Sequence, residues 1–337
     1  MRASVLTATR TIEIEERPEP EPRPGEVVVR VSAVGVCGSD IHYYRDGRIG
    51  PFIVDAPLVL GHEAAGEVVA LGDGVDAHEV GERVSLEPGV PDLTCRLCLE
   101  GRYNLCPNMR FFATPPIDGA FAEYVAIHQA FAHPVPDGVS DDAAALLEPL
   151  SVGLWACRKG AVGPGSRVLI NGAGPIGLVS LQAALAFGAT EVLVADVNQQ
   201  RLDVAASSGA TATLNVGDVP LDDAGVDADV LLECSGVPEA TTAALYALRP
   251  GGRAVLVGSG SHDVALPLMR LQVYELQVSG LFRYANTWPM AIELVASGRI
   301  DLDRLVTGHY GLDQTEEALT VGMRDPASIK PIVSPQT

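Results

Sequence analysis

The feature that most restricts the fold is a Gly-x-Gly-x-x-Gly pattern at residues 172–177, between a strand-like stretch and a helical one. The strand-like stretch covers 167–171, and an apolar helical pattern follows over 178–187. Glycines here allow a tight turn and let a pyrophosphate approach the amides at the helix start, which carry a partial positive charge. The pattern alone is a weak signal, because a glycine turn also serves in an α/β fold that binds no nucleotide.

Beyond this motif, strand-like and helical segments alternate along the chain. Such alternation predicts a parallel sheet with helices on its faces. We expect strands over 191–197, 229–233, 253–257 and 276–281, and helices over 199–207, 239–248 and 288–296.

The first 130 residues have a different character. Short β-branched stretches broken by glycine, at 27–31, 66–70 and 122–126, predict an antiparallel β domain. Ser140, followed by two aspartates, is a helix start, since acids are favoured at the positive end of the helix dipole. A chain of 337 residues suits two domains, and the tail after 296 is too short to fold alone. We therefore expect the tail to return to the N-terminal β domain.

Composition excludes several classes of function. A formal net charge of −20 repels phosphate backbones and anionic lipids, so we expect neither nucleic-acid nor membrane partners. No run approaches the roughly 20 apolar residues of a membrane helix. The N-terminus has no apolar stretch of the secretory type, so we expect a cytoplasmic protein whose thiols stay reduced. Clustered cysteines are then candidate metal ligands.

An acid follows the glycine motif at the distance that dinucleotide sites use. Asp196 ends the next strand, about 20 residues on, where a carboxylate accepts hydrogen bonds from both ribose hydroxyls of the adenosine half and repels a 2′-phosphate. We therefore expect NAD rather than NADP. Arg201 is either a cover for the adenine or a solvated helix charge. The expected cofactor residues are Gly172, Gly174, Pro175, Ile176, Gly177, Asp196 and Arg201.

Two short segments after β-like stretches carry donors that suit zinc. Cys37 is followed by Ser39, Asp40 and His42, and residues 61–63 read Gly-His-Glu. Thiolate, imidazole and carboxylate together are a zinc donor set. Taken singly, each residue is unremarkable, because a lone cysteine is more often core filler and a lone histidine more often a surface residue.

Together, the segments at 37–44, 60–63 and 147–151 closely resemble the zinc-dependent medium-chain alcohol and polyol dehydrogenases. Within that family they are most similar to the sorbitol (L-iditol 2-) dehydrogenases. The resemblance runs through nearly the whole chain, including 102–107, 113–119, the glycine motif, 233–236 and 281–289. It implies an α/β protein with an antiparallel, GroES-like catalytic domain over 1–147 and 285–337. A doubly wound, parallel-sheet Rossmann domain for NAD would then cover 148–284.

The resemblance also implies a catalytic zinc held by Cys37, His62 and Glu63, with Glu148 acting through a water molecule. Alcohol dehydrogenases of this type carry a cysteine ligand where Glu148 stands, and whether Glu148 binds the metal directly stays open. Trp155 departs from the family, in which a histidine is common there; that concerns helix packing rather than chemistry.

A second metal site is implied with one departure. Cys95, Cys98 and Cys106 match three ligands of a structural zinc lobe, but the first position is Asp92. A carboxylate can bind zinc, so a three-thiolate, one-carboxylate site is chemically reasonable. A vestigial loop with reduced thiols is the alternative.

By the same resemblance, Ser39 takes the alcohol proton and passes it through the cofactor ribose to His42, a task that Glu148 could share. Arg283 donates hydrogen bonds to substrate hydroxyls. An unpaired buried donor costs about 1–3 kcal/mol, which would favour hydroxyl-rich substrates. The implied substrate residues are Tyr43, Phe111, Glu148, Arg283 and Tyr284, and further cofactor residues are Val257, Leu281 and Phe282.

These residues predict an oxidoreductase that transfers hydride from a secondary alcohol of a small-molecule polyol to NAD, with Zn²⁺ as its metal. The alternatives are a zinc dehydrogenase of the same fold acting on a vicinal diol, threonine or an aminocyclitol, and a non-catalytic nucleotide-binding relative. Loss of the metal residues would mark the non-catalytic relative, and here they are present. The resemblance implies a homo-oligomer, either a dimer or a tetramer.

Overall fold

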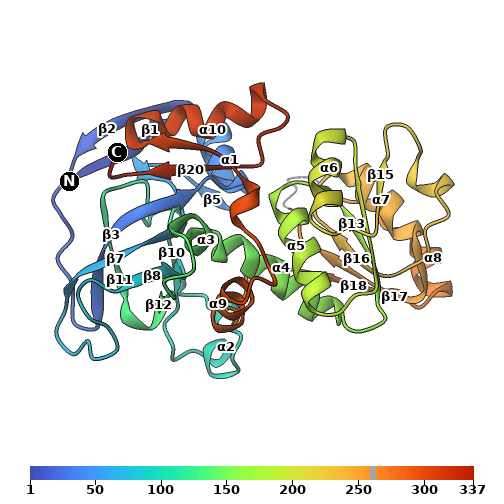
Figure 1. The fold of residues 1–337 in the computed structure, drawn as a ribbon, viewed down its shortest axis with the longest axis horizontal. Helices are drawn as coiled ribbons and strands as arrows, with labels where there is room; N and C mark the ends of the chain where they lie inside the picture. The colour runs from blue at the N-terminus through green and yellow to red at the C-terminus, as the bar shows by residue number, and fades with distance from the viewer. Residues whose placement is uncertain (259–262) are drawn as a thin grey trace. The chain divides into compact units, whose positions relative to one another are not determined.

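The computed structural model describes residues 1–258 and 263–337, and these form two compact units (Figure 1). Unit 1 consists of residues 1–148 and 288–337, and unit 2 of residues 149–287. The limits expected from the sequence were 1–147 with 285–337, and 148–284. Each unit has its own apolar core, and each is described separately below.

Unit 1 is built around a mostly antiparallel sheet. Its strand order is β12-β8-β7-β3-β20-β19, and β11 also pairs with β3. The strands are β1 (Arg2–Ala8), β2 (Thr11–Glu16), β3 (Glu26–Gly35), β4 (Arg48–Ile49), β5 (Phe52–Ile53), β6 (Leu58–Val59), β7 (Glu63–Leu71), β8 (Arg83–Leu86), β9 (Gly89–Val90), β10 (Arg110–Phe111), β11 (Tyr124–His128), β12 (Ala132–Pro134), β19 (Val306–Gly311) and β20 (Lys330–Ser334). The helices are α1 (Gly38–Asp46), α2 (Arg96–Leu99), α3 (Asp141–Ala145), α9 (Trp288–Ala296) and α10 (Thr315–Arg324), and α4 (Leu147–Gly160) begins at the end of this unit.

Two of the three expected antiparallel strands are present but longer: 27–31 lies within β3, whose Val side chains are buried, and 66–70 lies within β7. The third, expected at 122–126, is β11 and begins two residues later. The helix start at Ser140 is confirmed, since its hydroxyl accepts a hydrogen bond from the amide of Ala143 at 2.9 Å. One pair departs from the antiparallel pattern: β19 and β20 are parallel, because α10 connects them as a crossover helix.

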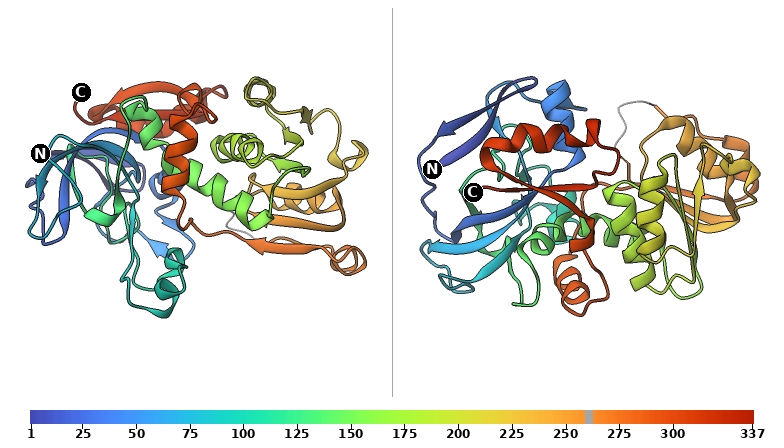
Figure 2. Two further views of the ribbon diagram at one scale, coloured as in Figure 1. Left: turned by 60° about the horizontal axis from the view of Figure 1, so that its bottom comes forward. Right: turned by 45° about the horizontal axis from the view of Figure 1, so that its top comes forward.

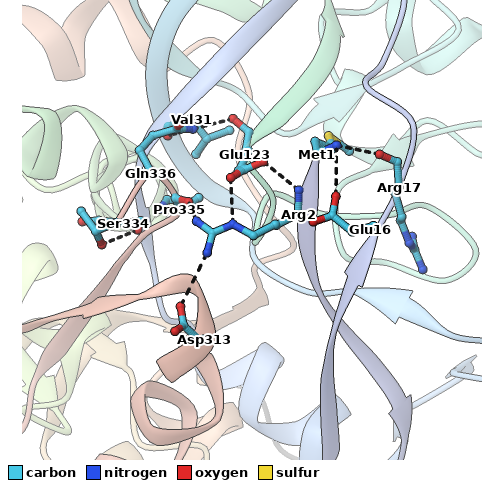
Figure 3. A network of polar contacts seen from close by, with 11 residues as sticks. Met1, Arg2, Glu16, Arg17, Val31, Glu123, Asp313, Ser334, Pro335 and Gln336 are labelled. Atoms are coloured by element: carbon cyan, nitrogen blue, oxygen red, sulfur yellow. Dashed lines mark hydrogen bonds and ion pairs between the residues drawn. The ribbon is translucent and has the colours of Figure 1, made fainter.

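The C-terminal segment completes the sheet of unit 1. β20 pairs antiparallel with β3, where Ile332 lies opposite Gly35. Figure 3 shows the polar contacts that join this segment to the N-terminus: Arg2 binds Glu123 at 2.9 Å, and the Gln336 amide donates to the carbonyl oxygen of Glu123 at 2.8 Å. The tail therefore returns to the β domain, as its length and pattern predict.

Unit 2 is a doubly wound α/β unit. Its six parallel strands have the order β15-β14-β13-β16-β17-β18: successive strands are added on one side of β13 as far as β15, and then on its other side from β16 to β18. The strands are β13 (Arg167–Asn171), β14 (Glu191–Asp196), β15 (Ala212–Asn215), β16 (Ala228–Glu233), β17 (Leu248–Leu256) and β18 (Gln277–Gly280). The helices are α5 (Pro175–Ala186), α6 (Gln199–Ser207), α7 (Pro238–Tyr246) and α8 (Leu268–Val273), with most of α4.

Helices cover both faces of this sheet, α5 and α6 on one and α7 on the other (Figures 1 and 2). The strands read as continuous Val, Leu and Ile runs, as expected when both faces are buried. The predicted fold class is confirmed. Sheet order of this type binds nucleotides at the carboxyl ends of the strands where the order reverses. Within the described residues, no helix is long and apolar enough to cross a membrane.

Candidate active site

The first metal donor stands between a strand and a helix. β3 ends at Gly35, and Cys37 is the extended residue immediately before α1. Asp40, at the third position of α1, accepts a hydrogen bond from the Cys37 amide at 3.0 Å, which satisfies a donor that the helix start leaves unpaired. This cap fixes the place of the Cys37 thiol.

The second donor is positioned by the same carboxylate. Gly61 has a φ of +86°, and a Cβ there would lie 2.9 Å from the Phe121 ring, so only glycine fits this turn. Its amide donates to Asp40 at 2.9 Å, and His62 Nδ1 lies 3.5 Å from the same carboxylate oxygen. Asp40 is fully buried and links the Cys37 and His62 segments, a contact of the kind that orients metal-binding histidines.

Three predicted ligands converge. A thiol sulfur of Cys37, a ring nitrogen of His62 and a carboxylate oxygen of Glu63 lie within 4.8 Å of one another. Burial favours the neutral ring of His62, but the neighbouring charges of Asp40 and Cys37 outweigh it and raise its pKa well above the ordinary value. Sulfur, nitrogen and oxygen donors in this arrangement fit a zinc ion.

A lysine that the sequence analysis missed lies against this donor set. Lys330 Nζ donates to both carboxylate oxygens of Glu63, at 2.8 Å each, and to the Val36 carbonyl oxygen at 3.0 Å. Burial works to lower the pKa of Lys330, yet Glu63, Cys37 and Glu148 raise it overall, so the ammonium stays charged. The buried Glu148, at the start of α4, is therefore part of the same electrostatic neighbourhood.

Other predicted residues of unit 1 lie on α1 and β10. The Phe111 ring contacts the His62 ring, with centroids 5.7 Å apart, and Tyr43 is buried on α1. Ser39 and His42 are three residues apart on α1 and so share a helix face. His42 Nδ1 lies 3.4 Å from Asp46, whose pKa a hydrogen bond from Arg45 lowers to about 2.

The four residues of the second cluster also converge. Asp92, Cys95, Cys98 and Cys106 each place one donor atom within 4.8 Å of the others. The Cys95 amide and the Asn108 side chain both donate to Asp92 and hold its pKa well below the usual range. Three sulfurs and one ionised carboxylate form a four-donor set of the size that structural zinc sites use.

The glycine motif of unit 2 forms a close turn at the start of α5. Gly172 has a φ of +104°, and a Cβ on Gly177 would lie 1.8 Å from the Gly172 carbonyl oxygen. Gly174, which precedes α5, has open space where a side chain would project, and Pro175 occupies the first helical position. Open amides at a helix start beside an uncrowded glycine fit a pyrophosphate.

The predicted acid lies beside that turn. Asp196 at the end of β14 accepts hydrogen bonds from the Ala173 amide at 2.6 Å and from the Asn198 amide at 2.8 Å. Arg201 Nε is buried without a hydrogen-bond partner among the described residues, an orphan donor that a bound ligand would satisfy. Both observations fit the adenosine half of a dinucleotide.

Comparisons with known proteins identify the family of the chain. The profile described as "Alcohol dehydrogenase GroES-like domain" matches residues 23–137, and "Zinc-binding dehydrogenase" matches residues 175–297. Sorbitol dehydrogenase of Bacillus subtilis is 45% identical to the chain over 95% of this chain and 92% of that protein. The chain belongs to the zinc-dependent medium-chain polyol dehydrogenases.

Two solved structures resemble this dehydrogenase along nearly its whole length. L-idonate 5-dehydrogenase from Escherichia coli has a TM-score of 0.92 at 30% identity, with 99% of this chain and 97% of that chain covered. An E. coli alcohol dehydrogenase whose structure holds NADH has a TM-score of 0.93 at 29% identity, with 99% of each chain covered.

In this dehydrogenase, the remaining predicted residues lie near the end of unit 2. Arg283, with a φ of +52°, stacks its guanidinium on the Phe282 ring at 4.7 Å, and Tyr284 is buried. The Leu281 amide donates to the Leu256 carbonyl oxygen at 3.0 Å, and the Val257 amide donates to the Glu233 carbonyl oxygen at 2.8 Å. Their roles toward cofactor and substrate stay predictions.

Sequence reasoning also missed a buried acid at the sheet's reversal point. Glu233, the last residue of β16, accepts hydrogen bonds from the Ser235 and Gly236 amides at 3.0 and 3.3 Å and from the Asn171 side chain at 3.3 Å. It ties the ends of β13 and β16 together beside the glycine turn. The sequence analysis named Asp40 only as a donor near Cys37. Its capping role has a local signal, an acid three positions after the residue that precedes a helix.

Proposed function

We propose that this chain is a zinc- and NAD-dependent polyol dehydrogenase, which oxidises a secondary hydroxyl group of a sorbitol-, xylitol- or iditol-type polyol to the ketone of a ketose. The observation that carries the proposal is the converged Cys37, His62 and Glu63 donor set in a chain 45% identical to a sorbitol dehydrogenase. Its presence disfavours a non-catalytic relative.

Zinc would be held by Cys37, His62 and Glu63, and NAD by the glycine turn with Asp196. When bound, zinc supplies a Lewis acid for the substrate hydroxyl and NAD supplies the hydride acceptor. The chain itself orients both sites. Asp40 keeps the Cys37 and His62 segments together, and Glu233 keeps the strand ends beside the turn in place.

Removal of the substrate's hydroxyl proton is assigned to α1. Ser39 Oγ would accept that proton while its own hydroxyl proton passes on toward His42, which lies on the same helix face, is partly open to solvent and releases a proton to bulk water. The Asp46 carboxylate lies 3.4 Å from His42 Nδ1, where it can hold the ring in place. Glu148 is a second acceptor at the site.

Substrate choice is assigned to the side chains of Tyr43, Phe111, Glu148, Arg283 and Tyr284. Phe111 lies against the His62 ring and so borders the metal donors. Arg283 would donate to hydroxyl groups that a simple alcohol lacks. A buried donor left unpaired costs about 1–3 kcal/mol, so polyols gain over monohydric alcohols.

The cluster of Asp92, Cys95, Cys98 and Cys106 is proposed as a structural zinc site. All six cysteines of the chain are free thiols, as metal binding requires, and a reducing cytoplasm would keep them so. We propose a cytoplasmic location on this ground.

We propose that the chain forms a homo-oligomer through a surface of unit 2. Among the described residues β18 pairs only with β17 and so forms an edge of the sheet. On α8, which precedes β18, the side chains of Leu268, Met269 and Val273 are 65, 72 and 67% exposed. An unpaired strand edge beside exposed apolar side chains favours pairing with a second copy.

Steady-state kinetics on a polyol series, with metal analysis, test the function. We expect sorbitol, xylitol or iditol to reduce NAD, and two zinc ions per chain. The Cys37→Ser variant should lose about a hundredfold to a thousandfold in kcat/KM, as removal of one catalytic electrostatic group typically does. Turnover of only a vicinal diol, threonine or an aminocyclitol would instead place the chain with the corresponding dehydrogenases.

The Arg283 assignment has its own test. Arg283→Ala should raise KM for polyols about tenfold to a hundredfold, because the hydrogen bonds to the extra hydroxyl groups are lost. KM for 2-propanol, which lacks those groups, serves as the control. Equal increases for both substrates would remove the role from Arg283.

A further inference from the structure

The charged ammonium group of Lys330 lies against Glu63, one of the metal donors. It is the first residue of β20, is 3% exposed, and directs its three N–H groups to three oxygens, two from Glu63 and one from Val36. An ammonium group has three donors and no acceptor. All three are therefore satisfied inside the protein.

The choice of lysine is unusual for this chain. Of its 23 basic residues only Lys159 and Lys330 are lysines, and Lys159 is exposed on α4. Arginine, used everywhere else, presents its donors in a planar fork that cannot converge on three acceptors around one atom. The buried position thus requires the compact charge of an ammonium group.

The partner carboxylate has little room to move. Glu63 is fully buried and lies opposite Gly35 in the pairing of β3 with β7. A Cβ on Gly35 would stand 2.1 Å from Glu63 Oε2, so the carboxylate fills the space that this glycine leaves. One of its oxygens also lies within 4.8 Å of the Cys37 and His62 donor atoms. Glu63 therefore lies between a resident cation and the place of the metal.

We propose that Lys330 is a positioning residue that shares the Glu63 carboxylate with the bound divalent cation and so weakens the hold of Glu63 on it. The inference deepens the proposed metal site and rests on it. Oxygens that already accept hydrogen bonds from an ammonium group donate less charge to a metal, and two buried cations repel each other with little screening. A loosely held third ligand suits a catalytic zinc site, in which the coordination must change as substrate enters.

Zinc affinity tests the inference without relying on activity. The full chain is stripped of metal and carries Cys98→Ser, which removes one ligand from the cluster around Asp92. It is then titrated with zinc against a competing chelator. Lys330→Met should bind zinc at least ten times more tightly than the parent, because it keeps the side-chain volume and removes the charge. The matched variant Lys159→Met should bind zinc as the parent does. An unchanged or weaker affinity in Lys330→Met overturns the inference.

A double variant separates sharing from simple charge repulsion. If Glu63 carries the effect, the gain from Lys330→Met should shrink at least threefold when Glu63→Gln is already present. An equal gain in zinc affinity with and without Glu63→Gln would mean that Lys330 only repels the metal ion and does not share the Glu63 carboxylate with it. That result would overturn the inference. If zinc binding by the parent is the same with Cys37→Ser, the metal site itself fails, and the inference fails with it.

A spectroscopic measurement needs no substitution at the site. Because the chain has two lysines, labelling lysine with ¹⁵N gives two ammonium signals, of which Lys159 is an internal control. Zinc should shift the Lys330 signal and leave that of Lys159 unchanged. A Lys330 signal that does not respond to zinc overturns the inference even if Lys330→Met fails to fold.

Discussion

Single carboxylates organise both halves of this protein. Asp40 accepts hydrogen bonds from the Cys37 and Gly61 amides and lies beside the His62 ring, so one buried residue positions two metal donors that are 25 positions apart. In unit 2, Asp196 binds the Ala173 amide of the glycine turn. At Asp40 and at Asp196, substitution by asparagine removes the charge while nearly keeping the shape of the side chain.

Asp40→Asn should weaken zinc binding about tenfold to a hundredfold, as loss of a partner that orients a metal-binding histidine typically does. The amide keeps the size of the side chain but presents one acceptor where the carboxylate presents two. Chelator competition measures the effect. Asp46→Asn, on the exposed end of the same helix, is the matched control; if both variants bind zinc equally well, Asp40 has no such role.

Asp196 is predicted to select NAD. Its carboxylate would face the 2′-phosphate of NADP, and like charges at such a contact cost several kcal/mol, or about a hundredfold in kcat/KM. Asp196→Asn retains an acceptor for the Ala173 amide while removing the charge, so we expect the preference for NAD to fall at least about tenfold. Kinetics with both cofactors measure it, and a parent enzyme faster with NADP would contradict the assignment.

At the scale of elements, the helix that carries the site is attached to the C-terminal segment. The Tyr44 hydroxyl of α1 donates to Glu316 of α10 at 2.6 Å, and both burial and this bond raise the Tyr44 pKa to about 12. α10 in turn leads into β20, which begins with Lys330. The position of α1 therefore depends on chain that folds back from the other end of the sequence.

Tyr44→Phe should lower the free energy of unfolding by about 1.5–3 kcal/mol at neutral pH, the usual contribution of a hydrogen bond to a charged group. The folded pKa of about 12 lies above the unfolded value of about 10, so this stabilisation is complete below about pH 10 and is lost as pH rises through 12. Denaturant unfolding at about pH 8 and about pH 11 should show that the difference in free energy of unfolding between the parent and Tyr44→Phe is smaller at the higher pH. A constant gap would argue against this contact.

At the scale of the whole molecule, the α8 surface is the candidate for self-association. Val273→Glu places a charge on this exposed apolar helix beside the edge strand β18 and should shift the mass measured by light scattering from oligomer to monomer. Met323→Glu, an exposed position on α10 of unit 1, should leave the oligomer intact. A parent protein that is monomeric at all concentrations, or a Val273→Glu variant that remains oligomeric, would contradict the proposed surface.

Much of the fold could be predicted from local pattern. From 167 to 256 the structure follows the predicted alternation, except that β15 was not predicted and β17 begins at Leu248, where a helix end was expected. α5 begins at Pro175, three residues before the apolar pattern, because proline is favoured in the first helical turn. α8 and the pair β19 and β20 were not predicted as elements. Their sequences are short, and β20 takes its place in the sheet by pairing with β3, which lies far away in the chain.

The sequence by itself determined the kinds of donor available, the nucleotide turn and the parallel sheet, because these depend on residue chemistry and on backbone preferences within one or two turns of chain. Tertiary structure alone decided that Lys330 meets Glu63, 267 positions away, and that Asp40 joins Cys37 to His62. Such contacts arise where β20 and β7 pair with opposite sides of β3. That pairing is selected by burial of whole strand faces, which no local pattern encodes.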